Sequence, residues 1–391
     1  MTRTGSAVKL LGLALVILVG GCASGGPKKY EAVFYPEPPE LPRIQFLTSF
    51  TEASDVQPGK SWFELFITGE KEARLRPDKP YGTAVHQGRI FVCDTNSTVV
   101  FFDLGKKTYG TLEGAVGLGK LRQPLNISID RDGNKYVADP VRSDIAVYDR
   151  NDAFVRSLNA PERWKPVDVA VFEDGVYVVD MKNALVHVFD RRNGAYLRKF
   201  GQSETAEGSL RLPANIAFDK DGYLYLSDTG RFQIVKMDRD GNIRGTFGQL
   251  GTSTGYFARP RGVAVDRAGR VYAVDAAFDN VQIFTAEKRM LMYFGKAGVK
   301  PGDLFLPASV TIDYDNVDYF RKFADPKFEI EHLIFVTSQF GERLVNVYGF
   351  GKEKGKTYPT EAELLERLME RMKIEKEKQE KEDGTASGEK K

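Results

Sequence analysis

Short apolar runs recur along the middle of the chain and are separated by polar turns. One unit reads GVAVDRAG, then VYAVD, then VQIFT, and ends near LMYFG. Alternating apolar and polar residues, with Asp-Gly or Ala-Gly between the first two runs, are typical of strands joined by hairpins. Four short strands in about 45 residues predict one blade of a β-propeller.

The unit repeats with a nearly constant period. A proline precedes the first run of each unit, at spacings of 44, 42, 47, 47 and 47 residues: Pro80, Pro124, Pro166, Pro213, Pro260 and Pro307. Six such units predict an all-β, six-bladed β-propeller over residues 43–350. The sixth unit lacks a fourth strand, and RIQFLTSF, residues 43–50, has the pattern of one. We expect residues 43–50 to close the ring by pairing there. The alternative is an open stack in which residues 43–50 form a separate strand.

The fifth unit, RPRGVAVDRAGRVYAVDAAFDNVQIFTAEKRMLMYFG, resembles an NHL repeat. That family has Pro-x-Gly-Val-Ala-Val-Asp, then Val-Tyr-Val-Ala-Asp, an apolar third strand and a closing Phe-Gly. The resemblance covers about residues 80–350, and it is weaker in the first and third units. It implies an NHL-like propeller.

An aspartate ends the second strand in five units: Asp94, Asp139, Asp180, Asp228 and Asp275. A carboxylate there can accept hydrogen bonds from backbone N–H groups of the next turn. One catalytic group suffices for an active site, whereas five copies around a ring suit a repeated structural part. We therefore expect these aspartates to stabilise turns.

The start of the chain has the pattern of an export signal. A basic start is followed by an apolar run, Leu10 to Val19, and then by Gly20-Gly21-Cys22. This resembles a bacterial lipobox, and it predicts removal of residues 1–21 as a lipoprotein signal peptide and a lipid on Cys22. Residues 22–42 are predicted to be a Pro-rich tether. By resemblance to enterobacterial lipoprotein sorting, the absence of Asp after Cys22 implies the outer membrane; a signal peptide with a chance cysteine is the alternative.

Charge and composition narrow the function further. The chain has 56 Lys and Arg against 54 Asp and Glu. Loss of Arg3 and Lys9 with the signal peptide leaves no net charge, so nucleic acid is not an expected partner. Cys93 is the second of only two cysteines, so no intrachain disulfide is expected once Cys22 carries lipid. Residues 351–391 are predicted to be a charged helix, capped by Thr360 and Glu363, and a disordered tail.

The residue two positions after each repeat proline is expected at one mouth of the central channel. Asn126, Asp168 and Asn215 take this place in adjacent blades. Their oxygens suit Ca²⁺ and resemble the calcium ring of lactonase-like propellers, which implies a Ca²⁺-dependent hydrolase, lactonase or lyase as one alternative function. Those enzymes have a further acid where Gly82 stands, and a hydrated channel lining is the simpler expectation. We expect no cofactor.

The histidines argue against an enzyme. His86, His187 and His332 occupy non-equivalent places in their units, so a three-His zinc site like that of amidating lyases with an NHL fold is not expected. The spacing of residues suggests no nucleophile–base pair.

The turns between second and third strands should surround the same mouth. They carry Arg142, Lys182, Arg231, Phe232, Phe278 and Phe340. Arginine and aromatic residues in exposed turns are typical of protein interfaces, although scattered surface residues are the alternative. The sequence thus predicts a lipid-anchored scaffold that binds an envelope or exported protein. The family resemblance adds multihaem cytochromes as one partner class; a glycan-binding lipoprotein is a third alternative.

The sixth unit has an insertion, residues 315–332, between its first two strands. It contains Tyr319, Phe320, Phe323 and Phe328. We expect these side chains either to pack over the blade or to meet a partner.

Overall fold

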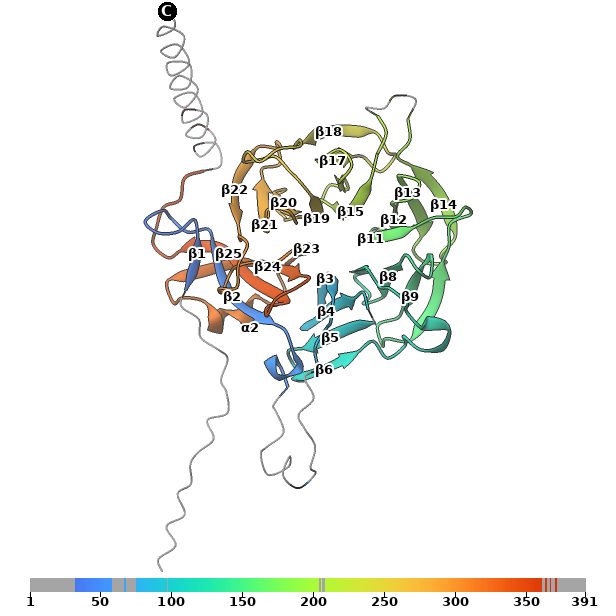
Figure 1. The fold of residues 1–391 in the computed structure, drawn as a ribbon, viewed down its shortest axis with the longest axis horizontal. Helices are drawn as coiled ribbons and strands as arrows, with labels where there is room; N and C mark the ends of the chain where they lie inside the picture. The colour runs from blue at the N-terminus through green and yellow to red at the C-terminus, as the bar shows by residue number, and fades with distance from the viewer. Residues whose placement is uncertain are drawn as a thin grey trace, which may run out of the picture.

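A computed structural model describes residues 32–57, 75–96, 98–203 and 208–360, together with residues 67, 205, 363, 366 and 370. Six antiparallel sheets surround a central axis as a closed six-bladed propeller (Figure 1). The predicted fold is therefore confirmed. Within the described residues, no helix is both long and apolar enough to cross a membrane.

Blades 1 to 5 each contain four strands, which follow in sequence order from the channel to the rim. Their bounds are, blade by blade, β3 (Pro80–His86), β4 (Arg89–Asp94), β5 (Val99–Asp103), β6 (Thr108–Thr111); β7 (Asn126–Ile129), β8 (Lys135–Asp139), β9 (Asp144–Tyr148), β10 (Phe154–Leu158); β11 (Pro166–Phe172), β12 (Gly175–Asp180), β13 (Leu185–Asp190), β14 (Tyr196–Phe200); β15 (Pro213–Phe218), β16 (Leu224–Asp228), β17 (Gln233–Met237), β18 (Ile243–Phe247); β19 (Pro260–Val265), β20 (Val271–Asp275), β21 (Asn280–Phe284), β22 (Met290–Phe294).

Blade 6 joins the two ends of the described chain. Its strands, from the channel outward, are β23 (Pro307–Asp313), β24 (Phe328–Ser338), β25 (Val345–Glu353), β2 (Ile44–Phe50) and β1 (Val33–Tyr35). β2 pairs antiparallel with β25, with Ile44 opposite Phe350 and Phe50 opposite Val345. The predicted closure by residues 43–50 is confirmed, and the open-stack alternative is wrong.

The predicted tether differs from the structure where it is described. Val33–Tyr35 form β1 on the free edge of β2, and the Tyr35 hydroxyl donates to the Gly302 carbonyl at 2.9 Å. Pro42 accepts a hydrogen bond from the Tyr358 hydroxyl at 2.8 Å. Residues 33–42 therefore lie against the propeller, because the apolar Val-Phe-Tyr triplet pairs with an otherwise unpaired edge. Residues 1–31, including Cys22, lie outside the described residues.

The predicted C-terminal helix is described only at its start. The Thr360 hydroxyl accepts from the Glu363 N–H at 3.3 Å, and the Glu363 carboxylate accepts from the Thr360 N–H at 2.7 Å. This is the predicted capping box. Glu363, Glu366 and Glu370 are helical; the rest of the segment, with the predicted disordered tail, lies outside the described residues. The propeller itself extends to Glu353, slightly beyond the predicted boundary at residue 350.

The core consists of six apolar clusters, one between each pair of neighbouring blades. Each blade thus buries both of its faces against its neighbours, which explains why one short sequence pattern recurs. The insertion of blade 6 forms α2 (Val317–Phe320) and η3 (Arg321–Phe323). Phe320 and Phe328 are buried between blades 6 and 1, so the insertion packs over the blade.

The repeated aspartates stabilise turns, as predicted, and also hold a second segment. Asp139 accepts from the N–H groups of Val141 and Arg142 in the following turn, at 3.1 and 3.0 Å. It also accepts from Arg122 and Gln123, just before the innermost strand of the same blade, at 2.6 and 3.0 Å. Each such carboxylate therefore ties the end of the second strand to the start of the first.

Candidate functional site

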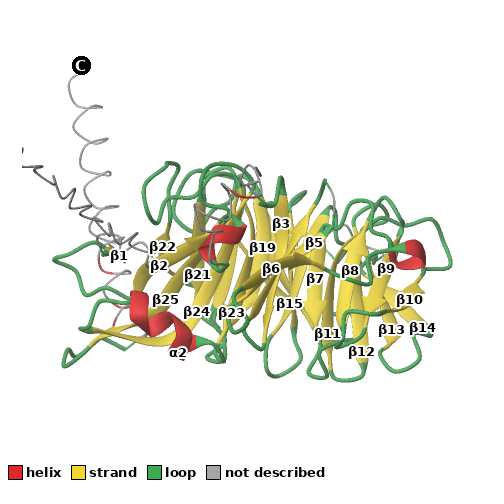
Figure 2. Cartoon of the chain, turned by 90° about the horizontal axis from the view of Figure 1, so that it is seen from below, coloured by secondary structure: helices red, strands yellow, loops and turns green. Residues whose placement is uncertain are grey.

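The two faces of the propeller are built from different turns. In blade 4, Pro213 at the start of β15 stands opposite Asp228 at the end of β16. The innermost strands therefore begin on the same face as the turns between second and third strands, as predicted. We call this the proline face. The opposite face carries the other hairpin turns and α2, at the lower edge of Figure 2.

Exposed large apolar side chains gather on the proline face. Its turns and approach segments carry Leu75, Val116, Leu118, Val141, Leu212, Leu250, Val299, Phe305 and Phe340. Four others lie elsewhere: Val155, Leu197 and Tyr293 on outer strands, and Ile67 between β2 and β3 in the sequence. In the described part of the chain, no turn of the opposite face carries one. Exposed apolar groups concentrated on one face are a feature of many interaction surfaces.

Charged groups of the opposite face are used to join neighbouring blades. Arg89 of blade 1 pairs with Asp152 of blade 2 at 2.7 Å. Arg239 of blade 4 pairs with Glu173 of blade 3 at 2.5 Å. These ion pairs connect neighbouring blades at the rim of that face, and the repeat pattern did not predict them.

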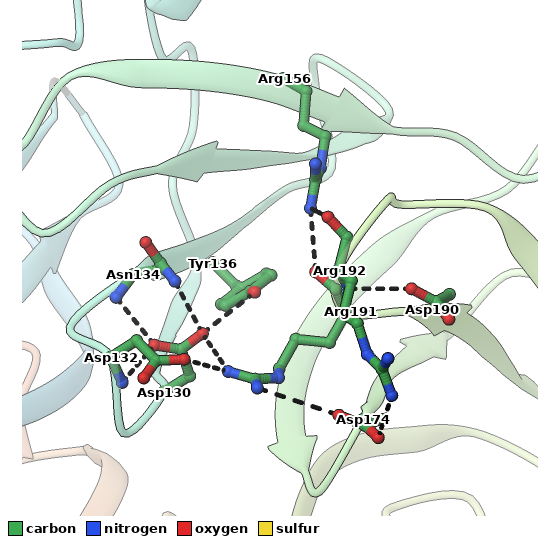
Figure 3. A network of polar contacts seen from close by, with 9 residues as sticks. All are labelled: Asp130, Asp132, Asn134, Tyr136, Arg156, Asp174, Asp190, Arg191 and Arg192. Carbon is green, nitrogen blue, oxygen red and sulfur yellow. Dashed lines mark hydrogen bonds and ion pairs between the residues drawn. The ribbon is translucent and has the colours of Figure 1, made fainter.

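Between blades 2 and 3 the opposite face carries a larger network (Figure 3). The Arg191 guanidinium lies 3.0 Å from the Asp130 carboxylate and 2.7 Å from that of Asp132. Arg156 donates to the Arg191 and Arg192 carbonyls, and a cavity of about 280 Å³ lies beside the network. Because Arg191 is already paired with carboxylates, we assign the network a structural role.

The predicted interface residues differ in how freely they project. Arg142 is largely buried, because its guanidinium pairs with Asp144 at 2.8 Å and donates to the Leu118 and Lys120 carbonyls. Arg231 lies 3.8 Å from the Asp228 carboxylate. Lys182 is exposed and reaches the Arg163 carbonyl at 3.3 Å.

The three predicted aromatic anchors also differ. Phe232 has a positive φ of 58° and packs partly buried against the cluster between blades 4 and 5. Phe278 is half-buried. Phe340 is 46 % exposed and pairs with the equally exposed Phe305, with ring centroids 6.1 Å apart. Phe340 is thus the aromatic residue of the predicted set that projects furthest.

The central channel holds the other predicted site. A cavity of about 520 Å³ is lined by the six innermost strands. Asn126, Asp168 and Asn215 come together at its proline-face end, as their equal places in adjacent blades predicted. The Asn215 amide donates to the Asp168 carboxylate at 3.0 Å, and the Asn126 amide donates to the Val167 carbonyl at 2.9 Å.

Asp168 is the unusual member of this group. It is buried, and burial raises the pKa of its carboxyl to about 7, although the N–H groups of Ile216 and Val169 donate to it at 2.9 and 2.8 Å. Among the described residues, no Lys or Arg forms an ion pair with it. The neighbouring Asn215 Oδ1 is buried without a hydrogen-bond partner. A buried carboxylate without an ion-pair partner and a buried amide oxygen without a hydrogen bond are groups that a cation can bind.

The fit to Ca²⁺ is nevertheless incomplete. The group offers one carboxylate and two amide oxygens, whereas Ca²⁺ takes 6–8 oxygen ligands. A Cβ placed at Gly82 would lie 2.3 Å from the Asn126 Oδ1, so no acidic side chain fits there while Asn126 keeps its position. Within the described residues, no group of three or more His, Cys, Asp or Glu side chains is arranged to hold a metal.

The histidines lie apart, in blades 1, 3 and 6. His187 is buried 3.3 Å from Asp180 and packs on Trp164. His332 stacks on Phe350, and burial lowers its pKa to about 4. Both serve the packing between strands, and His86 lies near the opposite face at the end of β3.

Comparison with known proteins supports the fold. No protein-family model and no curated protein matches the chain. A protein of unknown function from Bacteroides thetaiotaomicron VPI-5482 is similar in structure, with 15% identity, coverage of 78% of this chain and 75% of that one, and a TM-score of 0.56. A gluconolactonase from Xanthomonas campestris has 15% identity, coverage of 82% and 98%, and a TM-score of 0.51. Virginiamycin B lyase from Staphylococcus aureus has 12% identity, coverage of 70% and 96%, and a TM-score of 0.47.

At these identities the likeness shows a six-bladed propeller, and it assigns no activity. The resemblance to NHL repeats and the lipoprotein assignment stay predictions.

Proposed function

We propose that the protein is a lipid-anchored scaffold of the bacterial outer membrane whose proline face binds an exported protein. One observation carries this proposal: the exposed large apolar side chains lie on the proline face and the rim, and the turns of the opposite face that are described carry none. Leu118 is 85 % exposed and Val116 is 68 % exposed. Apolar groups at the centre of a protein interface would be removed from water on binding.

The rigid frame supports binding at this face. In blades 1 to 5 the turn between the second and third strands is fixed by a buried aspartate that accepts several backbone N–H groups, as Asp139 does. A partner therefore meets a preformed surface, and little conformational entropy is lost when it binds. On the opposite face, binding would compete with the ion pairs that join the blades.

The proposed contact residues differ from those predicted from the sequence, because some of the predicted side chains are already bound within the blade. Arg142 is replaced by the exposed apolar residues beside it, Leu118 and Val141, because its guanidinium is already bound within the blade. Lys182 stays in the set as an exposed cation. A multihaem cytochrome is one partner class that the resemblance to NHL-type lipoproteins implies.

Photocross-linking in whole cells tests this proposal. A photoreactive amino acid replaces Leu118 or Val141 on the proline face, and in matched strains it replaces Asp240 or Asp318 on the opposite face, whose side chains are 83% and 88% exposed. All four positions are exposed to solvent. A difference in cross-linking between them therefore reflects where the partner binds and not whether the probe is accessible.

A second function, Ca²⁺ binding in the channel by a lactonase-like or lyase-like propeller, is favoured by Asp168 and the unpartnered Asn215 Oδ1. If Ca²⁺ binds there, millimolar Ca²⁺ at pH 8 raises the melting temperature of the wild-type protein, because a cation offsets the cost of the buried carboxylate. Asp168→Asn abolishes this shift, and Asp266→Asn at the other end of the channel keeps it. An unchanged melting temperature in Ca²⁺ would exclude the site as a calcium site, and Mg²⁺ serves as the ion control.

A further inference from the structure

Three neighbouring segments of the proline face carry an unusual density of exposed apolar side chains. They are residues 248–259, 295–306 and 339–344, which we call the blade 5–6 sector. In it Leu250 is 63% exposed, Val299 72%, Phe305 49% and Phe340 46%. We propose that this sector lies against the surface of an anionic lipid membrane. The proposal rests on the lipid anchor of the proposed function for its place in the cell.

The sector is preformed. Isolated β-bridges between Leu250 and Phe257, and between Ala297 and Leu304, hold the first two segments. Phe257 and Leu304 are buried at the base of these bridges. The loop tips opposite them, including Val299, point into solvent on a fixed support. Such a tip can enter the headgroup region without a large loss of conformational entropy.

The third segment is joined to the second. Arg343 donates to the Val299 carbonyl at 2.5 Å, and the rings of Phe305 and Phe340 pack together. Phe305 and Phe340 therefore form one exposed apolar pair that both segments share. Apolar side chains held at neighbouring loop tips match the interface between lipid headgroups and acyl chains.

The charges of the sector suit an anionic surface. Arg259, Lys296 and Lys300 are exposed among the apolar residues, and Glu342 is the exposed acid of the sector, so cations outnumber it. Asp303 is buried and accepts from the Lys300 N–H at 2.9 Å, and Asp279 of the adjoining turn is partly buried and accepts from the Leu306 N–H at 2.5 Å, so neither carboxylate projects from the sector as the lysines do. Basic side chains beside apolar ones are attracted to anionic headgroups, each by about 1 kcal/mol near the surface.

The start of the described chain lies beside the same sector. The Tyr35 hydroxyl of β1 donates to the Gly302 carbonyl, and a Cβ placed at Gly302 would lie 3.2 Å from the Val33 side chain. Residues 22–32, fully extended, span at most about 36 Å. A lipid on Cys22 would thus keep the sector within a short distance of the bilayer, and this proximity favours lipid over a soluble protein as its occupant.

This orientation divides the proline face. Blades 5 and 6, with Phe340, meet the membrane, and blades 2 to 4, with Leu118 and Lys182, stay accessible to the protein partner. The predicted partner surface is therefore split between two occupants.

Vesicle binding tests the inference. The mature chain from residue 22, carrying Cys22→Ser and hence no lipid, is mixed with vesicles of phosphatidylethanolamine and phosphatidylglycerol, or of phosphatidylethanolamine and phosphatidylcholine, and bound protein is measured by cosedimentation. We expect salt-sensitive binding to the phosphatidylglycerol vesicles. Leu250→Gln with Val299→Gln should weaken it by about tenfold. The matched control, Val155→Gln with Leu197→Gln, alters two apolar residues of similar exposure on the rim and should bind as the parent does.

Several outcomes overturn the inference. No binding to phosphatidylglycerol vesicles, or equal binding by the sector variant and the parent, would contradict it. So would unchanged vesicle binding combined with loss of a cross-linked protein in the sector variant, which would assign the sector to a protein partner. The anchor is measured separately, by mass spectrometry of Cys22 in the native protein: an unlipidated Cys22 contradicts the proposed function and leaves the vesicle result standing.

Discussion

A chain that begins at Thr51, and so lacks β1 and β2, is expected to aggregate instead of folding. β2 supplies side chains to two interfaces: Leu47 and Phe50 between blades 6 and 1, and Ile44 and Phe46 between blades 5 and 6. Each loss of a buried large side chain costs about 2–5 kcal/mol, so the four together cost on the order of 10 kcal/mol, which is comparable to the whole stability of a domain. The truncation also exposes the edge of β25.

Size-exclusion chromatography and circular dichroism measure this outcome. A chain that begins at Ala32 is the control, and it should keep the melting temperature of the chain that begins at Cys22 because both strands are present. Phe46→Ala in the full chain gives a graded version, with a loss of about 3–5 kcal/mol. Adding a peptide of residues 32–51 to the truncated chain should restore its monomeric form. A truncated chain that stays monomeric with an unchanged melting temperature would show that the ring does not need this strand.

Asp139→Ala should lower the free energy of unfolding by about 4 kcal/mol or more. Asp139 is fully buried, and its carboxylate accepts four backbone N–H groups from two segments. Alanine leaves these donors without an acceptor, at about 1–3 kcal/mol for each donor that stays buried. The substitution also releases the turn that carries Val141 and Arg142, so the effect reaches the proposed partner surface.

Urea titration checks the value. Asp139→Asn should have an intermediate effect, because its amide oxygen still accepts hydrogen bonds while its N–H₂ group faces donors. Asp240→Ala serves as the matched control at an exposed turn aspartate, and it should change the midpoint little. If Asp139→Ala unfolds at the same urea concentration as the wild type, the structural role of the repeated aspartates is refuted.

The repeat pattern predicted much of the fold because each blade uses the same local signals. Proline starts most innermost strands, Asp closes the second strand, and Gly-containing turns join the hairpins, so strands and blade number could be read from spacing. β1 was not predicted, because a three-residue strand has no periodicity and forms only where β2 offers a free edge. The second set of N–H donors to each aspartate lies 15–17 residues earlier in the chain. For Asp139 these donors are Arg122 and Gln123, and they reach the carboxylate only once the strands of the blade have paired.

The candidate site was predicted unevenly for a similar reason. Asn126, Asp168 and Asn215 come together because equal positions in adjacent blades become neighbours around a ring. Whether a turn residue projects depends on its surroundings: Arg142 finds Asp144 and two carbonyl groups, and so it is unavailable to a partner. Leu118 lies in a short segment with no repeat pattern, and only the structure shows that it is exposed.

The proposed partner surface is tested most directly by the cross-linking measurement at Leu118 and Asp240. With a photoreactive amino acid at Leu118, the account predicts one discrete cross-linked protein, identifiable by mass spectrometry, and a product of the same mass from Val141. The probe at Asp240, or at Asp318, should give no such product. A discrete partner captured from the opposite face, with none from Leu118 or Val141, would contradict the assignment of the proline face as the binding surface.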